Sequence, residues 1–300
     1  MNLILERGTI KKLSELPPYS IALDGFVQGP EIDLQNHRIS LDHHSGVLRF
    51  CTEATCKQAW TMIRLGIEDL DQYTIYINDA DVDTCLAVWC LQNPDRCIEP
   101  LVKKLIDAVC QGDMHCGGIP LNGMEKYVEY ISGPETDSKR KQDYHKLSNE
   151  GLLSIMEAIM HRIDNYLEGH ADEELHKRTK HGEFKILRNE NGWLLAESND
   201  PHALGAIFRA GFDRALLIRK QDDGTIAATL AKKSDFVDHF PLEKIYFALS
   251  ALEPGKGTWG GGTTVGGPPR YSDGKRSEIQ LEKTISVIDE IVLQSYAKKT

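Results

Sequence analysis

The sequence predicts an α/β protein with a mostly parallel sheet and a second, smaller domain. In the first 125 residues, short apolar β-branched runs alternate with segments of helical period, a pattern that favours a doubly wound sheet. Acidic residues and histidines follow the apolar runs, as they do where strands end at a ligand site. The length of 300 residues suits two domains or one large one.

Three strands are predicted in the first half, and each ends at polar residues. They cover residues 20–23, 37–41 and 73–77. Because carboxyl ends of parallel strands meet at one edge of a sheet, the polar residues that follow are expected to lie close together. In chain order, these residues are Asp24, then Asp42-His43-His44, then Asp79, Asp81 and Asp83.

Helices are predicted between and after these strands. The first runs through residues 59–65, with Thr52 or Thr55 as its N-cap and Gly66 as its stop signal. The second covers residues 84–91 and ends at Asn93-Pro94. Pro100 opens a third, which keeps apolar residues on one face.

A connector is predicted to separate two domains. We expect a metal-binding domain over residues 1–135, a mostly helical connector over 136–181 and a substrate-binding domain over 182–300. Residues 135–148 are polar and predict a surface loop, whereas 151–168 keep helical apolar spacing. The charged stretch up to Lys180 extends this helix in the prediction.

The second domain is predicted to mix strands and helices. Strands are expected at residues 193–196, 215–219 and 225–230, the last two joined by a turn at Asp222-Asp223-Gly224. Helices are expected at 203–210 and 241–252, followed by a glycine-rich loop over 260–267.

Composition is that of a soluble globular protein. The apolar share is 41%, the charged share 27% and the formal net charge −10, which argues against extended, non-specific nucleic-acid binding. The N-terminus lacks the apolar core of a signal peptide, and no run approaches the ~20 apolar residues of a membrane helix. The seven cysteines are odd in number and irregularly spaced. We therefore expect a cytoplasmic protein with reduced thiols and no membrane partner.

Asp79, Asp81 and Asp83 alternate, so an extended backbone points them the same way. Three like charges on one face repel unless a cation lies among them. Oxygen ligands suit hard divalent cations, and added histidine shifts the preference toward Mn²⁺, Fe²⁺ or Zn²⁺. A solvated acidic loop is the alternative.

The segment Asp42-His43-His44 is a more specific signal. Adjacent histidines on an extended backbone point to opposite sides, so one can bind metal while the other faces a substrate phosphate. The alternative is a polar turn. Asp24, before Gly25, can bridge two metals or simply form a turn. Asp113, just past the predicted third helix, is equally ambiguous alone.

The glycine-rich loop predicts an anion site. Its glycines can expose backbone N–H groups, and Arg270 can clamp a phosphate or carboxylate. The alternative is a flexible surface loop. The predicted substrate-binding residues are Gly261, Gly262, Thr263, Gly266, Gly267 and Arg270.

Together, these segments resemble the DHH phosphoesterase superfamily. Asp42-His43-His44 matches its naming motif, residues 77–84 resemble its aspartate-rich motif, Asp24 its isolated aspartate and residues 105–114 its late aspartate motif. Residues 225–270 resemble the family's DHHA1 domain, with Thr263 where the family usually has histidine. The family's leading histidine or aspartate has no clear counterpart, so either Asp79 with Asp81 or Asp81 with Asp83 corresponds to the metal-binding pair of its aspartate-rich motif. The motif order differs, because the aspartate-rich motif comes first in the family. A circular permutation of the sheet accounts for this.

The resemblance implies a metal-dependent phosphoesterase. We expect two divalent ions, Mn²⁺ with Mg²⁺ or Co²⁺ as alternatives, that activate a water to attack phosphorus. The substrate is expected to be a small phosphorylated molecule, a nucleotide or a short oligonucleotide, and a homodimer is left open. The expected metal ligands are Asp24, which bridges, with His43, Asp79, Asp81, Asp83 and Asp113; the expected catalytic residues are Asp42, His43 and His44.

Two other functions remain open from the sequence. One is a non-catalytic nucleotide- or metal-responsive binding protein on the same fold. The other is a hydrolase of a non-phosphate ester or amide on this scaffold.

Overall fold

The chain forms two compact units. The computed structural model describes residues 1–141, 143–171, 175, 182–220, 226–255, 257–269 and 277–297. Contacts group Met1–Met114 with Ile119–Thr179 as unit 1, and His115–Gly118 with Lys180–Thr300 as unit 2. Each unit is described by itself.

Unit 1 is built on a five-stranded sheet with the order β1-β5-β2-β4-β3. Its strands are β1 (Asn2–Leu5), β2 (Ser20–Leu23), β3 (Glu31–Asp33), β4 (Arg38–Leu41) and β5 (Thr74–Ile77). All neighbours run parallel except β3, which pairs antiparallel with β4. Leu23 lies beside Leu41, and Ala22 beside Tyr76, so β2, β4 and β5 end at the same edge.

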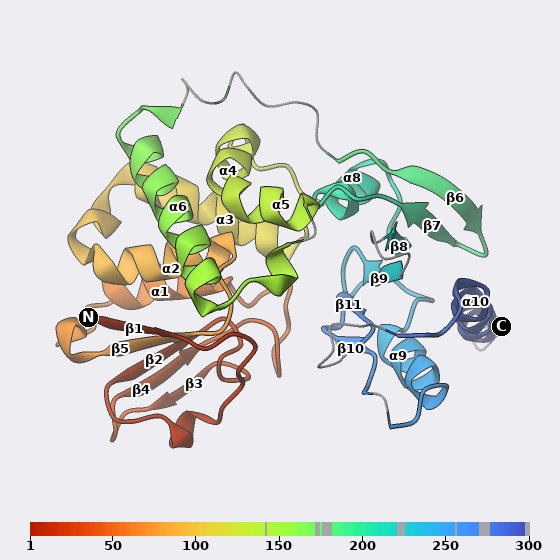
Figure 1. Ribbon diagram of the computed structural model, residues 1–300, viewed down its shortest axis with the longest axis horizontal. Helices are drawn as coiled ribbons and strands as arrows, with labels where there is room; N and C mark the ends of the chain where they lie inside the picture. The colour runs from red at the N-terminus through yellow and green to blue at the C-terminus, as the bar shows by residue number, and fades with distance from the viewer. Residues whose placement is uncertain are drawn as a thin grey trace. The chain divides into compact units, whose positions relative to one another are not determined.

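Helices cover one face of this sheet. They are α1 (Thr55–Arg64), α2 (Val82–Gln92), α3 (Pro100–Met114), α4 (Glu125–Ile131), α5 (Gly133–Arg140) and α6 (Asn149–Leu167). In Figure 1, α1 and α2 lie over the strands. Residues 83–91 of α2 are all buried, because this helix packs on the sheet on one side and on other helices on the other. Ile21, Ile75 and Trp89 belong to the resulting core.

The other face of the sheet is covered by non-helical chain. Leu13 in a 3-10 turn (Leu13–Glu15), together with Phe26 and Val27, packs against Ala22 and Tyr76. The segment between β1 and β2 is short and contains Pro17-Pro18, so a long helix cannot form there. In the described part of unit 1, this face therefore lacks the α-helical layer that a doubly wound sheet places there.

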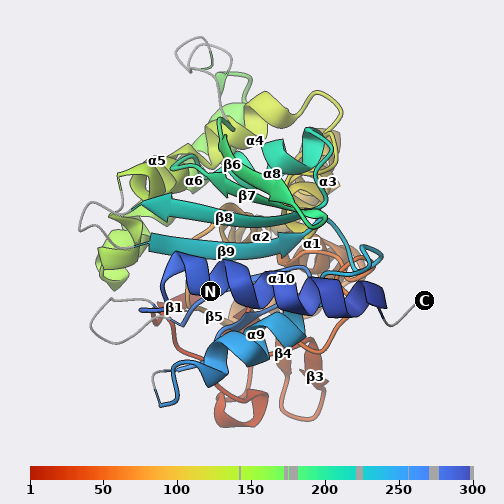
Figure 2. The same ribbon diagram turned by 90° about the vertical axis from the view of Figure 1, so that its right-hand side faces the viewer.

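Unit 2 is built on a six-stranded mixed sheet with the order β10-β11-β9-β8-β7-β6. Its strands are β6 (Lys185–Glu190), β7 (Trp193–Glu197), β8 (Arg214–Lys220), β9 (Ile226–Lys232), β10 (Gly260–Gly261) and β11 (Val265–Gly267). Only β7 and β8 pair in parallel among these described strands, and α8 (Ala203–Arg209) connects them. Figure 2 shows β8 and β9 side by side.

Alternating side chains give unit 2 a core on each face of its sheet. Leu216 and Ile218 pack toward α9 (Leu242–Ala251) and α10 (Leu281–Ala297). Ala215 and Leu217 pack toward α8. This period of two is the one expected of a strand that is buried on both faces.

The predicted α/β class is confirmed, and so are most of the predicted elements. The loop predicted for residues 135–148 is wrong at its start, because α5 continues to Arg140 and buries Glu135 and Thr136. The predicted threonine cap of α1 is also wrong: Ala54 is the N-cap, and the Asp83 carboxylate accepts from the first amides instead.

Some predictions lie outside or beyond the described structure. The turn at residues 222–224 and the helical extension over 172–174 and 176–180 fall outside the described residues. By its contacts α6 belongs to unit 1, and the predicted domain boundaries stay predictions. All seven cysteines are free thiols. No helix within the described ranges has the length and apolar character needed to cross a bilayer.

Candidate metal centre

Carboxylates and imidazoles gather where β2, β4 and β5 of unit 1 end. Asp24 follows β2, Asp42-His43-His44 follow β4, and Asp79, Asp81 and Asp83 follow β5. Asp113 joins them from the last turn of α3. The edge of the sheet, rather than closeness in the chain, thus brings these groups together.

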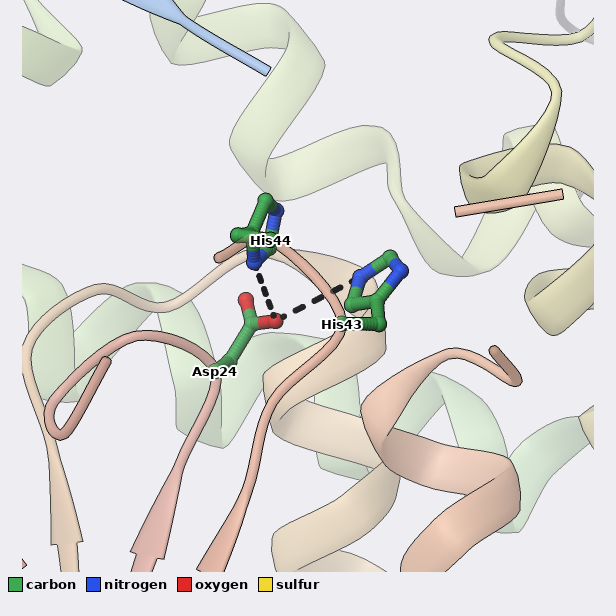
Figure 3. Close-up of side chains that lie close together, drawn as sticks. All are labelled: Asp24, His43 and His44. Atoms are coloured by element: carbon green, nitrogen blue, oxygen red, sulfur yellow. Dashed lines mark ion pairs between the residues drawn. The ribbon is translucent and has the colours of Figure 1, made fainter. Parts of the chain in front are cut away.

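Asp24 lies between the two histidines (Figure 3). Its Oδ1 atom is 3.6 Å from His43 Nε2 and 3.4 Å from His44 Nδ1. The hydroxyl groups of Thr55 and Thr84 donate to its two oxygens at 3.0 and 2.9 Å. Its backbone has the left-handed φ of 52°, which Asp tolerates better than most residues. Two hydroxyls therefore hold the Asp24 carboxylate in a fixed orientation.

His43 is fully buried, with no exposed surface. Its Nε2 atom lies 2.9 Å from Asp113 Oδ2 and 3.8 Å from Asp83 Oδ2. Among the described residues, neither ring nitrogen makes a hydrogen bond of acceptable geometry. A buried imidazole in this state is rare unless it has another partner, such as a metal ion.

Asp113 also contacts a buried arginine. Arg49 Nη2 donates to Asp113 Oδ2 at 3.2 Å. Burial alone favours the neutral acid, but the contact with His43 and the charge of Arg49 lower the pKa of Asp113 to about 2. Asp113 is therefore ionised at neutral pH.

Asp42 orients its neighbours instead of facing the other carboxylates. Its Oδ1 accepts from the His44 amide at 3.0 Å and lies 2.9 Å from His44 Nδ1, and its Oδ2 accepts from Gly29 N at 2.7 Å. Burial opposes ionisation, but these hydrogen bonds lower the pKa of Asp42 to about 2. Burial likewise opposes the protonated His44 ring, yet the bond to Asp42 raises the pKa of His44.

Asp83 closes the N-terminus of α1. Its two oxygens accept from Thr55 N and Cys56 N, both at 2.9 Å. An anion at a helix N-terminus is favourable because the amides there lack partners within the helix. Even so, burial and then the nearby carboxylates raise the pKa of Asp83 to about 6.

Asp79 and Asp81 have different local partners. Asp81 is the N-cap of α2 and accepts from Thr84 N at 2.8 Å. Asp79 Oδ1 accepts from Tyr144 Oη at 2.5 Å and from Ala80 N at 2.8 Å. Both aspartates lie close enough to the ion pair of Glu135 and Lys139 to act on its charges. Burial raises the pKa of Glu135 to about 7, and the charges of the two aspartates add to this effect.

The electrostatics of the centre fit a bound cation. Burial and then neighbouring carboxylates raise the pKa of Asp24 well above its ordinary value, and the same causes raise that of Asp81. Crowded carboxylates titrate in this way when no positive charge separates them. A divalent cation would remove the repulsion.

Two sets of ligand atoms are compact enough to hold an ion. They are Asp24 with His43 and His44, and His43 with Asp83 and Asp113; within each set the atoms lie within 4.8 Å of one another. Oxygen and imidazole donors together suit Mn²⁺, Fe²⁺, Co²⁺ or Zn²⁺. Among the described residues, Asp79 and Asp81 belong to neither set.

The predicted glycine site lies in unit 2 and forms a tight hairpin. Gly260–Gly261 pairs with Val265–Gly267, and Gly262 N donates to Val265 O at 2.8 Å. A Cβ on Gly266 would lie 2.3 Å from Gly260 O and 2.4 Å from Tyr246 Oη. Close approaches thus account for Gly261, Gly266 and Gly267. Anion binding by Gly261, Gly262, Thr263, Gly266 and Gly267 stays a prediction. Arg270 lies outside the described residues.

Sequence reasoning missed several residues of the centre. Arg49 reaches it from a turn, Tyr144 from a 3-10 helix (Tyr144–Lys146), and Glu135 and Lys139 from a helix that was expected to be a loop. The i, i+4 spacing of Glu135 and Lys139 is a helix signal that could have identified α5. For Arg49 and Tyr144 the sequence carries no comparable signal.

No model of a protein family matches this chain, and no curated protein matches it significantly.

Proposed function

We propose that this protein is a metal-dependent phosphoesterase that hydrolyses a small phosphorylated molecule, a nucleotide or a short oligonucleotide. The observation that carries the proposal is His43. Its ring is fully buried, its nitrogens make no hydrogen bond within the described residues, and Nε2 lies within 2.9–3.8 Å of three carboxylates. Buried imidazole and carboxylate donors around one point are typical of a divalent metal site.

Two ions are proposed to share the centre. His43, Asp83 and Asp113 would hold one, because they form one of the compact sets. Asp79 and Asp81 would hold the other, and Asp24, which lies against both histidines and whose pKa the charge of Asp81 helps to raise, would bridge the two. In this proposal Asp83 is a full ligand and all three alternating aspartates take part. Mn²⁺ is the proposed ion, with Mg²⁺ or Co²⁺ as alternatives.

Divalent cations bound here would activate a water as nucleophile and offset the charge on the phosphoryl oxygens. The chain's own residues prepare the site for this reaction. Thr55 and Thr84 fix the Asp24 carboxylate, and Asp42 fixes the His44 ring. His44 keeps 40% of its side chain exposed, so in the proposal it meets the substrate phosphate.

The family proposed is the DHH phosphoesterase superfamily, with a permuted sheet. Support comes from β2, β4 and β5, which are parallel neighbours that end at one edge. Because the site depends on which strand ends meet, a different order of the same strands along the chain can preserve it. Unit 2 is proposed to be the DHHA1-like, substrate-binding part.

The proposal is tested by metal binding and turnover together. Metal-stripped protein should bind Mn²⁺ in calorimetry and hydrolyse a generic phosphodiester such as bis(p-nitrophenyl) phosphate only after Mn²⁺ is restored. The His43→Ala and Asp113→Asn variants should lose Mn²⁺ affinity and turnover by more than the roughly 10–100-fold typical of outer partners. His161→Ala, at an exposed position on α6, is the matched control.

Two results would count against the proposal. Full turnover by exhaustively stripped protein would exclude the metal mechanism. Tight Mn²⁺ binding without turnover of any phosphoester in a broad panel would favour the non-catalytic binding protein, and turnover restricted to carboxylic esters or amides would favour the other hydrolase.

A further inference from the structure

Arg49 is a buried cation at the edge of the centre. It follows the Asp42-His43-His44 segment in a loop before α1 and is only 8% exposed. Its Nη2 atom donates to Asp113, to Oδ2 at 3.2 Å and to the backbone oxygen at 3.4 Å. Among the described residues, its Nε atom is buried without a hydrogen-bond partner.

A single carboxylate cannot accept hydrogen bonds from all the donors of this guanidinium. Arginine carries five N–H donors in a rigid fork, and burial is costly for donors that remain unpaired. Asp113 Oδ2 is in addition shared with His43 Nε2 at 2.9 Å. When Asp113 serves as a metal ligand, its negative charge is committed to the metal, and Arg49 requires a second anion.

The region next to Arg49 can admit such an anion. The Asp113 side chain is 29% exposed and that of His44 is 40% exposed, so both reach solvent beside the buried arginine. Arg49 and His44 are linked through Asp113 and His43, because His43 Nε2 lies 2.9 Å from Asp113 Oδ2 and the centroids of the His43 and His44 rings are 4.3 Å apart.

We propose that Arg49 binds the phosphoryl group of the substrate, with its guanidinium fork donating to two phosphoryl oxygens. Arginine suits this role because its planar fork matches phosphate geometry, whereas lysine offers only a point charge. The inference rests on the proposed function and adds the residue that recognises the phosphate within unit 1.

The test separates anion binding from metal binding. Arg49→Gln and Arg49→Lys are prepared beside the parent, and Mn²⁺ affinity is measured by calorimetry first. Inorganic phosphate is then titrated into each Mn²⁺-loaded protein. Arg49→Gln should weaken phosphate binding about tenfold or more, as expected for a lost charge-assisted hydrogen bond. Its Mn²⁺ affinity should change by less than about threefold, because the guanidinium is not a metal ligand. Arg49→Lys should keep part of the phosphate affinity.

Arg38→Gln is the matched control. Arg38 also pairs with an aspartate, Asp33, at 3.3 Å and also has a buried Nε without a partner among the described residues, but it starts β4, at the opposite end from the centre. Its phosphate affinity should equal that of the parent.

The possible failures are distinguishable. A parent protein that binds no Mn²⁺ contradicts the proposed function. A parent that binds Mn²⁺ but no phosphate, or an Arg49→Gln protein with unchanged phosphate affinity, contradicts only the inference. If Arg49→Gln weakens Mn²⁺ binding but leaves phosphate affinity unchanged, Arg49 orients the Asp113 carboxylate and does not bind the phosphate.

Discussion

Tyr144 fixes the direction in which Asp79 points. The tyrosine is 6% exposed, and its hydroxyl donates to Asp79 Oδ1 at 2.5 Å. The ring is held in turn by two cations, with Lys139 Nζ 5.0 Å and Arg7 Cζ 5.8 Å from its centroid. A hydrogen bond to a ligand carboxylate sets its orientation and its basicity, so Tyr144 is a positioning residue for a proposed metal ligand.

Replacing this tyrosine should weaken one ion more than the other. Tyr144→Phe keeps the ring but removes the hydroxyl, and we expect Mn²⁺ affinity at the Asp79 side to fall by about 10–100-fold. Calorimetric titration should then resolve one tight and one weakened ion. Tyr166→Phe is the control, because Tyr166 is buried in the same unit and its hydroxyl contacts Met124 Sδ at 3.7 Å, away from the aspartates. If both Mn²⁺ affinities are unchanged in Tyr144→Phe, Tyr144 does not position Asp79 for metal binding.

At the scale of elements, the β10–β11 hairpin depends on a glycine at a position where a side chain would not fit. Gly266 lies against Gly260 O and Tyr246 Oη, and β11 also pairs with β9. Gly266→Ala should destabilise unit 2 by about 1–3 kcal/mol, as overpacking of a closed site usually does. Urea unfolding followed by fluorescence would measure this.

Gly260→Ala is the matched control for that hairpin. A Cβ at Gly260 meets no atom within 4 Å, and its φ is not left-handed. Its unfolding midpoint should stay near that of the parent. Equal losses in both variants would mean that the strand itself, not the close approach, limits stability.

The same elements show what periodicity can and cannot predict. The strands that lead to the centre were predictable because β2 and β5 are short apolar runs that end at polar residues. Apolar periodicity could not predict the start of α5, because Gly133–Arg140 is mostly polar. The i, i+4 pair of Glu135 and Lys139 was the remaining helix signal there. The glycine hairpin was read as a loop, because two- and three-residue strands leave no pattern.

At the scale of the molecule, proton and metal binding should compete. Asp24, Asp81 and Asp83 have raised pKa values in the folded, metal-free protein, that of Asp83 to about 6. An unfolded Asp titrates near a pKa of about 3.9. Between those values the folded state binds more protons than the unfolded state, so these groups make the metal-free protein less stable as pH rises from about 4 to 6.

Added Mn²⁺ should therefore stabilise the protein more at about pH 7 than at about pH 5. At the higher pH the carboxylates are deprotonated and can bind the ion. A Mn²⁺ concentration of about 100 times the dissociation constant then adds about 2.7 kcal/mol to the free energy of unfolding. At the lower pH, protons on Asp83 must leave first. Thermal unfolding with and without Mn²⁺ at both pH values measures the difference. A shift that is equal at both pH values, or larger at the lower one, contradicts the expectation.

The centre itself was only partly predictable from the chain. Four separate segments supply its residues Asp24, His43, Asp83 and Asp113. Each was predicted because it lies near the end of a predicted strand or helix. The residues that contact these carboxylates and set their charge or orientation could not be predicted. Arg49 lies 64 residues from Asp113 and Tyr144 lies 65 residues from Asp79, so those pairs exist only once the fold has formed.

Asp83 also limits what mutagenesis can reveal. Because both of its oxygens close the first turn of α1, an Asp83→Ala protein loses two backbone hydrogen bonds together with a proposed ligand. If an Asp83 variant is inactive, the loss of the helix cap cannot be separated from the loss of the proposed metal ligand. His43 carries no such double duty among the described residues, since its ring holds no other group by a hydrogen bond. Substitutions at His43 therefore remove a proposed ligand without removing a helix cap.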